Sequence, residues 1–190
     1  MPTTLTFAAA VPTLYGDLVT LRELAEDDIP AWFARATDAE SADLAGDPIP
    51  ESIEEGAGWL QVHRDRFREQ TGIRWAIVPN GPTQSVGTIG LTITLEEERR
   101  ADLGYVIGRA HWGQGICTAA ARLVTAYAFE HLGLAEVRAE LLQRNVASRR
   151  VLEKTGFRFQ QALQVEDPPG SPPEDCYVYL LSAAPVAAAE

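Results

Sequence analysis

The feature that most constrains this chain is a glycine-containing turn that joins an alternating apolar segment to a helical one. Leu103, Tyr105 and Ile107 alternate with other residues and predict a strand, and a helix is predicted from about residue 117. Gly113 and Gly115 lie between the two, where the absence of a Cβ atom lets a ligand approach the backbone. A helix start also offers unpaired N–H groups and the positive end of the helix dipole. We therefore interpret this turn as a binding site for a pyrophosphate group.

The residues around the turn favour an anion but match neither common nucleotide motif. Between residues 108 and 123 there is no acidic residue, whereas Arg109, His111 and Arg122 are basic. The turn is not a P-loop, because no Gly-Lys-Ser/Thr follows the glycines. It is a poor dinucleotide fingerprint, because the third glycine of that motif would fall at Thr118. Taken by itself, the turn can also be a tight connection that binds no ligand.

Composition and charge exclude some classes of function. The chain has 190 residues, enough for one domain with a substantial core. Its 16 basic and 27 acidic residues give a net charge of −11, which argues against nucleic acid as the main partner. The acidic surface either attracts cationic amines or is simply a solvated exterior.

Cysteine usage and the N-terminus indicate a cellular compartment. Cys117 and Cys176 have no metal-ligand spacing, and two lone cysteines fit a reducing cytoplasm. No basic region precedes the apolar N-terminal segment, and no apolar run approaches the length of a membrane span. We therefore expect a cytoplasmic protein with no metal site and no membrane partner.

Hydrophobic periodicity predicts strands and helices within one domain, residues 14–182, between a flexible arm at 1–13 and a flexible tail at 183–190. Strands are predicted at residues 18–22, 73–78, 85–94, 103–107, 136–142, 157–162 and 176–181. Helices are predicted through residues 31–34, from 52 to before 72, from 117 to near 133 and from 145 to 156. The order indicates an antiparallel meander, followed by a strand–helix–strand unit long enough for a right-handed crossover to a parallel strand.

Segments outside the glycine turn also bear on a substrate site. Residues 37–50 are polar and acidic with Pro and Gly, so we expect a loop that either overhangs the site or only connects two helices. Charged residues 96–100 and the Pro-rich residues 165–175 are also expected to be loops. In the helix opened by Ser52 and Glu55, which match a capping box, His63 lies on the apolar face. We expect His63 to be a packed residue rather than a catalyst.

A second motif, Asn145-Val-Ala-Ser-Arg-Arg-Val-Leu-Glu-Lys-Thr-Gly-Phe157, follows the predicted parallel strand. Together with Gly104-Tyr105 and Trp112-Gly-Gln-Gly, it resembles the GNAT family of N-acetyltransferases, and more narrowly the RimJ/RimL-like branch. The likeness spans about residues 18–181. It implies an α+β GNAT fold: a mixed, mostly antiparallel sheet of about seven strands, splayed between the fourth and fifth, with helices on both faces.

The resemblance implies acetyl-CoA as co-substrate and places its binding residues. The turn amides would hold the pyrophosphate, the end of the preceding strand would pair with the pantetheine arm, and Asn145 would contact the cofactor from the far side. The implied contacts are Ile107, Gly108, Arg109, Trp112, Gly113, Gln114, Gly115, Ile116, Cys117, Thr118 and Asn145. Cys117 stands where the family usually has Gly or Ala. Arg149, Arg150 and Lys154 either meet the 3′-phosphate or are exposed helix charges.

The chemistry of acetyl transfer points to further residues. The acceptor amine must be neutral, the Ile107 N–H would stabilise the developing oxyanion, and an acid would assist the leaving thiolate. Many family members have a Tyr acid where this chain has Leu152, and Ser148 is the candidate acid instead, unless its role is a helix-start hydrogen bond. Asp102 is the candidate base, unless it is a solvated charge. Cys117 is expected to be a packed residue, so transfer would be direct.

The resemblance therefore predicts an acetyl-CoA-dependent N-acetyltransferase acting on a primary amine through a ternary complex. The acceptor would be a protein N-terminal amine of the ribosomal-protein type, or alternatively a small amine such as a polyamine or an antibiotic. A non-catalytic CoA-binding regulatory module is an alternative from another class. A homodimer is left open.

Overall fold

The computed structural model of the protein describes residues 7–46, 48–94, 99–166 and 172–183. Its centre is an eight-stranded sheet with the strand order β1-β2-β3-β4-β5-β6-β8-β7. The strands are β1 (Leu14–Tyr15), β2 (Val19–Glu23), β3 (Gly72–Pro79), β4 (Gly87–Ile93), β5 (Arg100–Ile107), β6 (Glu136–Leu142), β7 (Arg158–Val165) and β8 (Glu174–Ser182). The helices are α1 (Ile29–Ala36), α2 (Ala39–Ala45), α3 (Glu55–Arg68), α4 (Ile116–Glu130) and α5 (Val146–Lys154). Short 3-10 turns are η1 (Glu26–Asp28) and η2 (Arg109–His111).

The predicted sheet is confirmed, including its splay. All seven predicted strands are present, and the two-residue β1 adds an eighth at one edge. Neighbouring strands pair antiparallel except β5 and β6, which pair in parallel. That pairing covers only Arg100–Asp102 against Glu136–Arg138, whereas β4 follows β5 as far as Ile107. Beyond Asp102, β5 and β6 therefore separate and leave a gap in the sheet.

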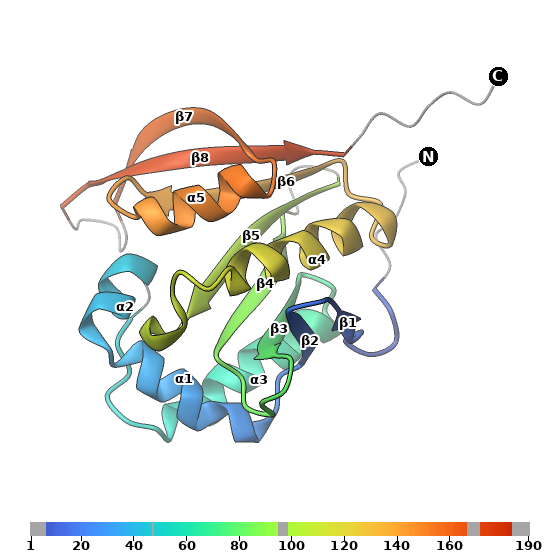
Figure 1. Cartoon of the computed structure of the whole chain (residues 1–190), viewed down its shortest axis with the longest axis vertical. Helices are drawn as coiled ribbons and strands as arrows, with labels where there is room; N and C mark the ends of the chain where they lie inside the picture. Colours follow the sequence, from blue (N-terminus) through green and yellow to red (C-terminus); the bar gives the residue numbers. More distant parts are fainter. Residues whose placement is uncertain (1–6, 47, 95–98, 167–171, 184–190) are drawn as a thin grey trace.

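Helices cover both faces of the sheet (Figure 1), and the alternation along the strands decides which face each residue meets. On β3, Ile73, Trp75 and Ile77 join the main core with α4. Ala76 and Val78 point to the other face, where they pack with Leu60 of α3. Among the described residues, no helix is both long and apolar enough to cross a membrane.

The segment of residues 7–13 contacts the core at several points, although residues 8–10 are exposed. Phe7 is 7% exposed and belongs to the main core cluster. The indole Nε1 of the fully buried Trp75 donates to the carbonyl oxygen of Pro12 over 2.8 Å. The rest of the predicted arm and most of the predicted tail, residues 1–6 and 184–190, lie outside the described residues. Parts of the predicted loops at 96–100 and 165–175 do so too.

The loop prediction for residues 37–50 is wrong, because this segment contains α2. Asp38 is the N-cap of α2, and its carboxylate accepts the N–H of Ser41 over 3.0 Å. Gly46 ends the helix in a left-handed conformation with φ of +70°, the usual glycine stop. The N-cap residue and the terminal glycine are both present in the sequence. The loop was predicted instead because the polar, acidic composition of the segment is typical of a loop.

Candidate active site

The end of β5 presents backbone N–H groups to the gap beside β6. The N–H of Gly108 donates to the carbonyl oxygen of Val86 over 2.9 Å, so this amide points toward β4. Successive residues of a strand direct their backbone groups to opposite edges, so the N–H groups of Tyr105 and Ile107 point into the gap. The indole Nε1 of Trp112 donates to the Ile107 carbonyl oxygen over 3.0 Å and holds this strand end in place. An extended ligand can therefore pair with this edge as an added strand would.

The glycine turn follows the end of β5 and lies at the start of α4. Gly113 and Gly115 have φ of +74° and +79°, the left-handed region that glycine adopts without a Cβ penalty. Neither residue is crowded: a Cβ at Gly113 would meet nothing within 4 Å, and one at Gly115 would meet only Leu18 Cδ2 at 3.9 Å. The glycines therefore serve the backbone conformation rather than tight packing. That conformation starts α4 at Ile116, without any side-chain cap at Gly115.

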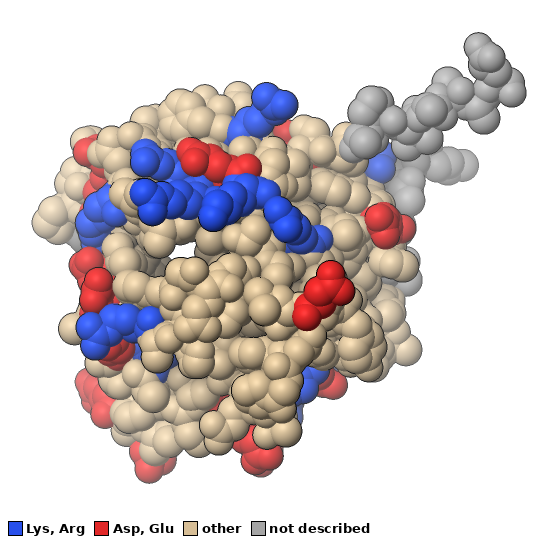
Figure 2. Space-filling view, viewed as in Figure 1, with Lys and Arg blue, Asp and Glu red and all other residues tan. Residues whose placement is uncertain are grey.

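A cavity of about 340 Å³, here called the glycine-turn cavity, lies between this turn and α5. Among the described residues, its lining has no acidic residue, and it includes the basic side chains of Arg35, His111, Arg150 and Lys154. Figure 2 shows Lys and Arg side chains in a row over α5, beside a hollow in the surface. Unpaired helix-start amides and a basic rim together form an anion site.

A second cavity of about 560 Å³, here called the α3-side cavity, lies on the other side of the gap. It is lined by residues of α1 and α3, by residues of the strands from β3 to β8, and by residues of α5. The two cavities meet where β5 and β6 separate. The residues that line both are Arg35, Leu44, Ala45, Tyr105, Val106, Asn145 and Ser148.

Tyr105 and Ser148 connect the two sides of the gap. The Tyr105 hydroxyl lies 2.8 Å from Ser148 Oγ, and either atom can be the donor. The same hydroxyl lies 3.1 Å from the Ser148 carbonyl oxygen. At the start of α5, the Asn145 side chain accepts the Ser148 N–H over 3.0 Å. Burial raises the pKa of Tyr105, so its hydroxyl keeps its proton at neutral pH.

Ion pairs connect α2 to the segments that follow β5 and β6, on the two sides of the gap. After β5, the Arg109 guanidinium pairs with Asp38 over 3.2 Å and with Glu40 over 3.3 Å. After β6, the Arg144 guanidinium pairs with the Asp43 carboxylate over 3.0 Å. The Asn145 side chain also donates to the Leu44 carbonyl oxygen over 3.2 Å. α2 is therefore held across the meeting point of the two cavities, a place that the sequence prediction gave to a loop.

Comparison with known proteins identifies the family. The model of the acetyltransferase (GNAT) domain matches residues 19–158. The uncharacterized N-acetyltransferase YoaA of Bacillus subtilis (strain 168) is 33% identical over 170 residues, covering 90% of this chain and 96% of that protein. This chain belongs to the GNAT acetyltransferase family.

Solved structures share the fold of this acetyltransferase. Mycobacterium smegmatis RimJ in complex with CoA-disulfide has a TM-score of 0.77 at 24% identity, covering 91% of this chain and 88% of that chain. Spermidine N-acetyltransferase from Vibrio cholerae, in complex with CoA and spermine, has a TM-score of 0.73 at 17% identity. The match covers 86% of this chain and 95% of that chain. At these identities the likeness shows a common fold.

The co-substrate of this acetyltransferase is acetyl-CoA, as in the family, and the glycine-turn cavity fits it. The two left-handed glycines line the cavity at the start of α4, and basic side chains lie on its rim, where phosphate charge would be offset. Eight of the eleven residues predicted to contact the cofactor line this cavity: Ile107, Trp112, Gly113, Gly115, Ile116, Cys117, Thr118 and Asn145.

Three predicted cofactor residues do not line the cavity. The N–H of Gly108 is bonded to Val86. Arg109 pairs with α2. The Gln114 side chain donates back to the Ala110 carbonyl oxygen over 3.0 Å. The structure thus gives these three residues contacts within the protein, and their cofactor contacts stay a prediction.

The predicted catalytic residues separate into two groups. Ile107 and Ser148 line the glycine-turn cavity, and Ser148 lines both cavities. Asp102 lines neither, and its carboxylate accepts a bond from the Arg138 guanidinium over 3.1 Å. Leu152 is 1% exposed. Burial raises the pKa of the Cys117 thiol to about 12, so little of it is thiolate at neutral pH.

Sequence reasoning missed several residues of the site. Tyr105 belongs to the Gly104-Tyr105 motif, but the sequence predicts no role for its side chain. Its contact with Ser148 joins residues that are 43 positions apart in the chain. Trp32 and Trp59 line the α3-side cavity, where their rings stack at 5.3 Å. Arg66 and Arg74 line the same cavity. Their helical and strand periodicity was visible in the sequence, but nothing there indicated which cavity they would face.

Proposed function

We propose that this acetyltransferase transfers the acetyl group to the α-amino group of a polypeptide N-terminus, by direct attack within a ternary complex. The observation that supports this is the meeting of the two cavities at the gap between β5 and β6. One cavity has the features of a cofactor site, and the other offers a separate approach to the same point. Donor and acceptor can thus be bound together, which is the condition for transfer without a covalent enzyme intermediate.

Acetyl-CoA supplies an activated acetyl thioester, whose carbonyl carbon is attacked by a neutral amine while CoA leaves as the thiolate. The Ile107 N–H, which points into the gap, is proposed to donate to the thioester oxygen as negative charge develops there. Amides of residues 113–118 hold the pyrophosphate, and Arg150 and Lys154 face the remaining phosphate charge. Because burial raises the pKa of the Cys117 thiol, it is a poor nucleophile at neutral pH, which argues against an acetyl-cysteine intermediate.

Ser148 is the proposed acid for the leaving thiolate, and Tyr105 is the residue that positions it. When the Tyr105 hydroxyl donates to Ser148 Oγ, the Ser148 proton is directed away from Tyr105 and toward the cavity. The proton that the acceptor nitrogen loses after attack can restore the Ser148 hydroxyl, so Tyr105 keeps its own proton throughout. This positioning needs both hydroxyls, whereas a purely structural Ser148 needs only its backbone N–H.

The charges around the α3-side cavity favour an α-amine over a lysine amine. Within the described residues, the acids that line it are Glu140 and Glu174, which pair with Arg138 and Arg144. In the part of the chain that the structure describes, no acid lines the glycine-turn cavity. An α-amine, with a pKa near 8, reaches its neutral form with far less help than a lysine amine near 10.4. The role predicted for Asp102 as base stays a prediction.

The test is thiol release from acetyl-CoA with matched acceptors. Peptides with a free N-terminus and no lysine are compared with the same peptides that have a blocked N-terminus and one internal lysine. Spermidine and an aminoglycoside represent small amines. We expect turnover with the free N-termini and at least about tenfold less with the lysine peptides. Turnover confined to the small amines would overturn the polypeptide acceptor and favour the alternative.

A further inference from the structure

One face of α3 gives the α3-side cavity an aromatic wall. Trp59, Val62, His63 and Arg66 are spaced as residues on one side of a helix, and all of them line this cavity. Trp59 stacks on Trp32 of α1 with ring centres 5.3 Å apart, and His63 packs edge-on against Trp59 at 5.2 Å. The rings are thus already ordered by one another, so a ligand that binds against them does not have to order them.

This wall is uncharged at neutral pH and partly open to solvent. Burial, together with the charges of Arg74 and Arg66, lowers the pKa of His63 to about 3, so its imidazole is neutral at pH 7. Val62 is 49% exposed, and Pro48, which follows α2, is also exposed. Both residues line the cavity. Exposed apolar side chains around a cavity are typical of a ligand-binding surface.

The charged side chains of the same cavity are engaged within the protein or exposed to solvent. Glu140 and Glu174 each form an ion pair with an arginine. Arg35 and Arg74 both have partners within the protein, and Arg74 donates to the side chain of Thr88 over 3.2 Å. Arg66 is exposed. We therefore look to the apolar residues of this cavity for recognition of an acceptor.

The apolar lining continues to the place where acetyl-CoA and the acceptor would meet. Leu44 and Ala45 of α2 and Val106 of β5 line the α3-side cavity and the glycine-turn cavity alike. An amine at the gap between β5 and β6 and an apolar group against Trp59 can therefore belong to one ligand in one cavity.

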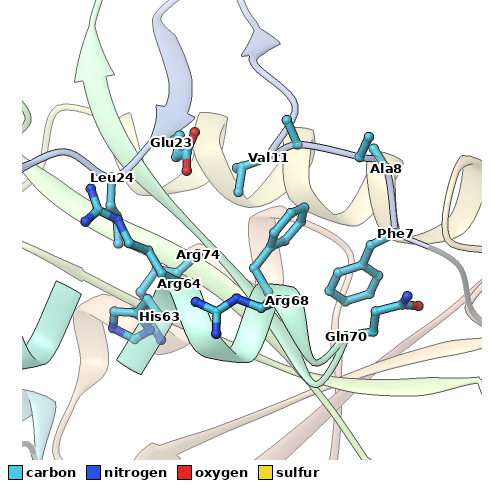
Figure 3. A pocket seen from close by; sticks show the side chains of 13 residues that line it. Phe7, Ala8, Val11, Glu23, Leu24, His63, Arg64, Arg68, Gln70 and Arg74 are labelled. Carbon is cyan, nitrogen blue, oxygen red and sulfur yellow. The ribbon is translucent and has the colours of Figure 1, made fainter. Parts of the chain in front are cut away.

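A neighbouring face of α3 lines a third cavity, which differs in this respect. It has a volume of about 450 Å³ and lies between the N-terminal segment and α3, where Arg64 and Phe67 line it. Figure 3 shows Phe7 toward one end of it and His63 with Arg74 toward the other. None of the described residues that line it also lines the glycine-turn cavity. Of these two cavities beside α3, the α3-side cavity is thus the one that leads to the gap.

We propose that the acceptor carries an apolar group beside its amine, and that Trp32, Trp59 and Val62 bind this group. In a polypeptide it is the side chain of residue 2, 3 or 4, counted from the acetylated residue. The inference rests on the proposed function, because it assigns the α3-side cavity to the acceptor. Apolar surface that leaves water against this wall contributes binding free energy. A polyamine, whose chain carries several charges, is expected to be a poor acceptor.

The test uses pairs of acceptors in which an apolar group is replaced by a polar group of nearly the same shape. The peptides are Ser-Ala-Ala-Ala-Gly amide with Leu or Asn placed in turn at position 2, 3 or 4. The small-molecule pair is 3-methylbutylamine with 3-aminopropanamide. Wild-type enzyme and its variants are compared by kcat/KM for each member of a pair.

The variants are Val62→Asn, Trp59→Leu and the control Ile53→Asn. Ile53 is a matched control, because it is 40% exposed and does not line the α3-side cavity. Thermal unfolding and the acetyl-CoA dissociation constant show whether each variant is folded and binds its donor. Trp59 packs against a buried cluster, so the exposed Val62 decides the test if Trp59→Leu does not fold.

We expect wild-type enzyme and Ile53→Asn to prefer Leu over Asn by about ten- to a hundredfold at one or more of these positions, the effect of burying one leucine side chain. In Val62→Asn this ratio falls by about fourfold or more, because the Leu side chain loses apolar contact. Trp59→Leu keeps part of the preference, because leucine is apolar but smaller. A wild-type ratio near one at every position, or a ratio that Val62→Asn leaves intact or lowers no more than Ile53→Asn does, would overturn the proposal.

The outcomes separate this inference from the proposed function. If peptides turn over equally well with Leu and Asn, the proposed function holds and the apolar site is wrong. If 3-methylbutylamine alone is acetylated, and Val62→Asn slows it, the polypeptide acceptor is wrong and the apolar site holds. If no acceptor turns over, the N-acetylated peptides are titrated into the enzyme–CoA complex. Tighter binding of a Leu form, weakened in Val62→Asn, supports the apolar site without any turnover, and equal binding of the Leu and Asn forms overturns it.

Discussion

The Tyr105 hydroxyl lies 2.8 Å from Ser148 Oγ, across the gap between β5 and α5. This contact separates two roles of Ser148. Its backbone N–H, bonded to Asn145, supports the start of α5, and its hydroxyl is available for chemistry. The two roles can be distinguished because they use different atoms of one residue.

Ser148→Ala is expected to lower kcat by about a hundredfold, because the variant keeps the backbone bond to Asn145 and loses the proposed acid. Tyr105→Phe removes the hydroxyl contacts with Ser148 Oγ and the Ser148 carbonyl oxygen but keeps the proposed acid, so it is expected to cost about tenfold or less. Tyr15→Phe, at a side chain that is 77% exposed, is the control. Steady-state kinetics and acetyl-CoA binding measure these effects. A Ser148→Ala enzyme with normal kcat would leave Ser148 a structural role alone.

Gly115→Ala is expected to weaken acetyl-CoA binding by about tenfold. Alanine in the left-handed region costs about 1–2 kcal/mol, and the open surroundings let the turn relax away from that conformation. The melting temperature should fall by a few degrees. Gly58→Ala is the control, because Gly58 lies inside α3 with no atom within 4 Å of the added Cβ. Isothermal titration of both variants decides this, and equal affinities would contradict the role of the turn.

The strands and the turn could be predicted because their signals are local. Residues 136–142 alternate in sequence, and β6 spans the same residues. A helix is predicted to start at Asn145, and in the structure Asn145 is the N-cap of α5. The spacing of the glycines likewise identified the turn before α4. Each of these inferences needed only neighbours within about a dozen residues.

The missing parts of the site depend on strand register and on contacts between distant segments. The Arg74 side chain reaches β5 because Gly90 and Gly104 are its cross-strand neighbours in β4 and β5. This register cannot be read from a short stretch of sequence. Asp102 is predicted as the base because it lies close to Gly104-Tyr105 in sequence. The parallel pairing of β5 and β6 places it opposite Arg138. A residue near a motif in sequence can therefore face a different partner in the sheet.

Asp43→Ala is expected to loosen α2 while leaving global stability nearly unchanged. The Asp43–Arg144 pair is exposed, so its loss costs no more than about 1 kcal/mol of unfolding free energy. Amide hydrogen exchange in α2 should accelerate, and the KM for acetyl-CoA should rise, because α2 lines the glycine-turn cavity. Asp65→Ala, which breaks an exposed pair with Arg68 on α3, is the control. Unchanged exchange in α2 would show that its other contacts, including those with Arg109 and Asn145, hold it without the Asp43 carboxylate.

His63→Leu is expected to make the protein less sensitive to acid. Burial and the nearby Arg74 and Arg66 lower the pKa of His63 to about 3 in the folded state, against about 6.5 in the unfolded chain. Between these values the unfolded chain binds a proton that the folded protein does not, so the unfolding free energy falls as pH falls. The slope from this one group is at most about 1.4 kcal/mol per pH unit. Urea unfolding from pH 7.5 to 4 measures it. Wild-type and His63→Leu curves that run parallel below pH 6.5 would show that His63 is protonated in the folded protein, against the packing described here.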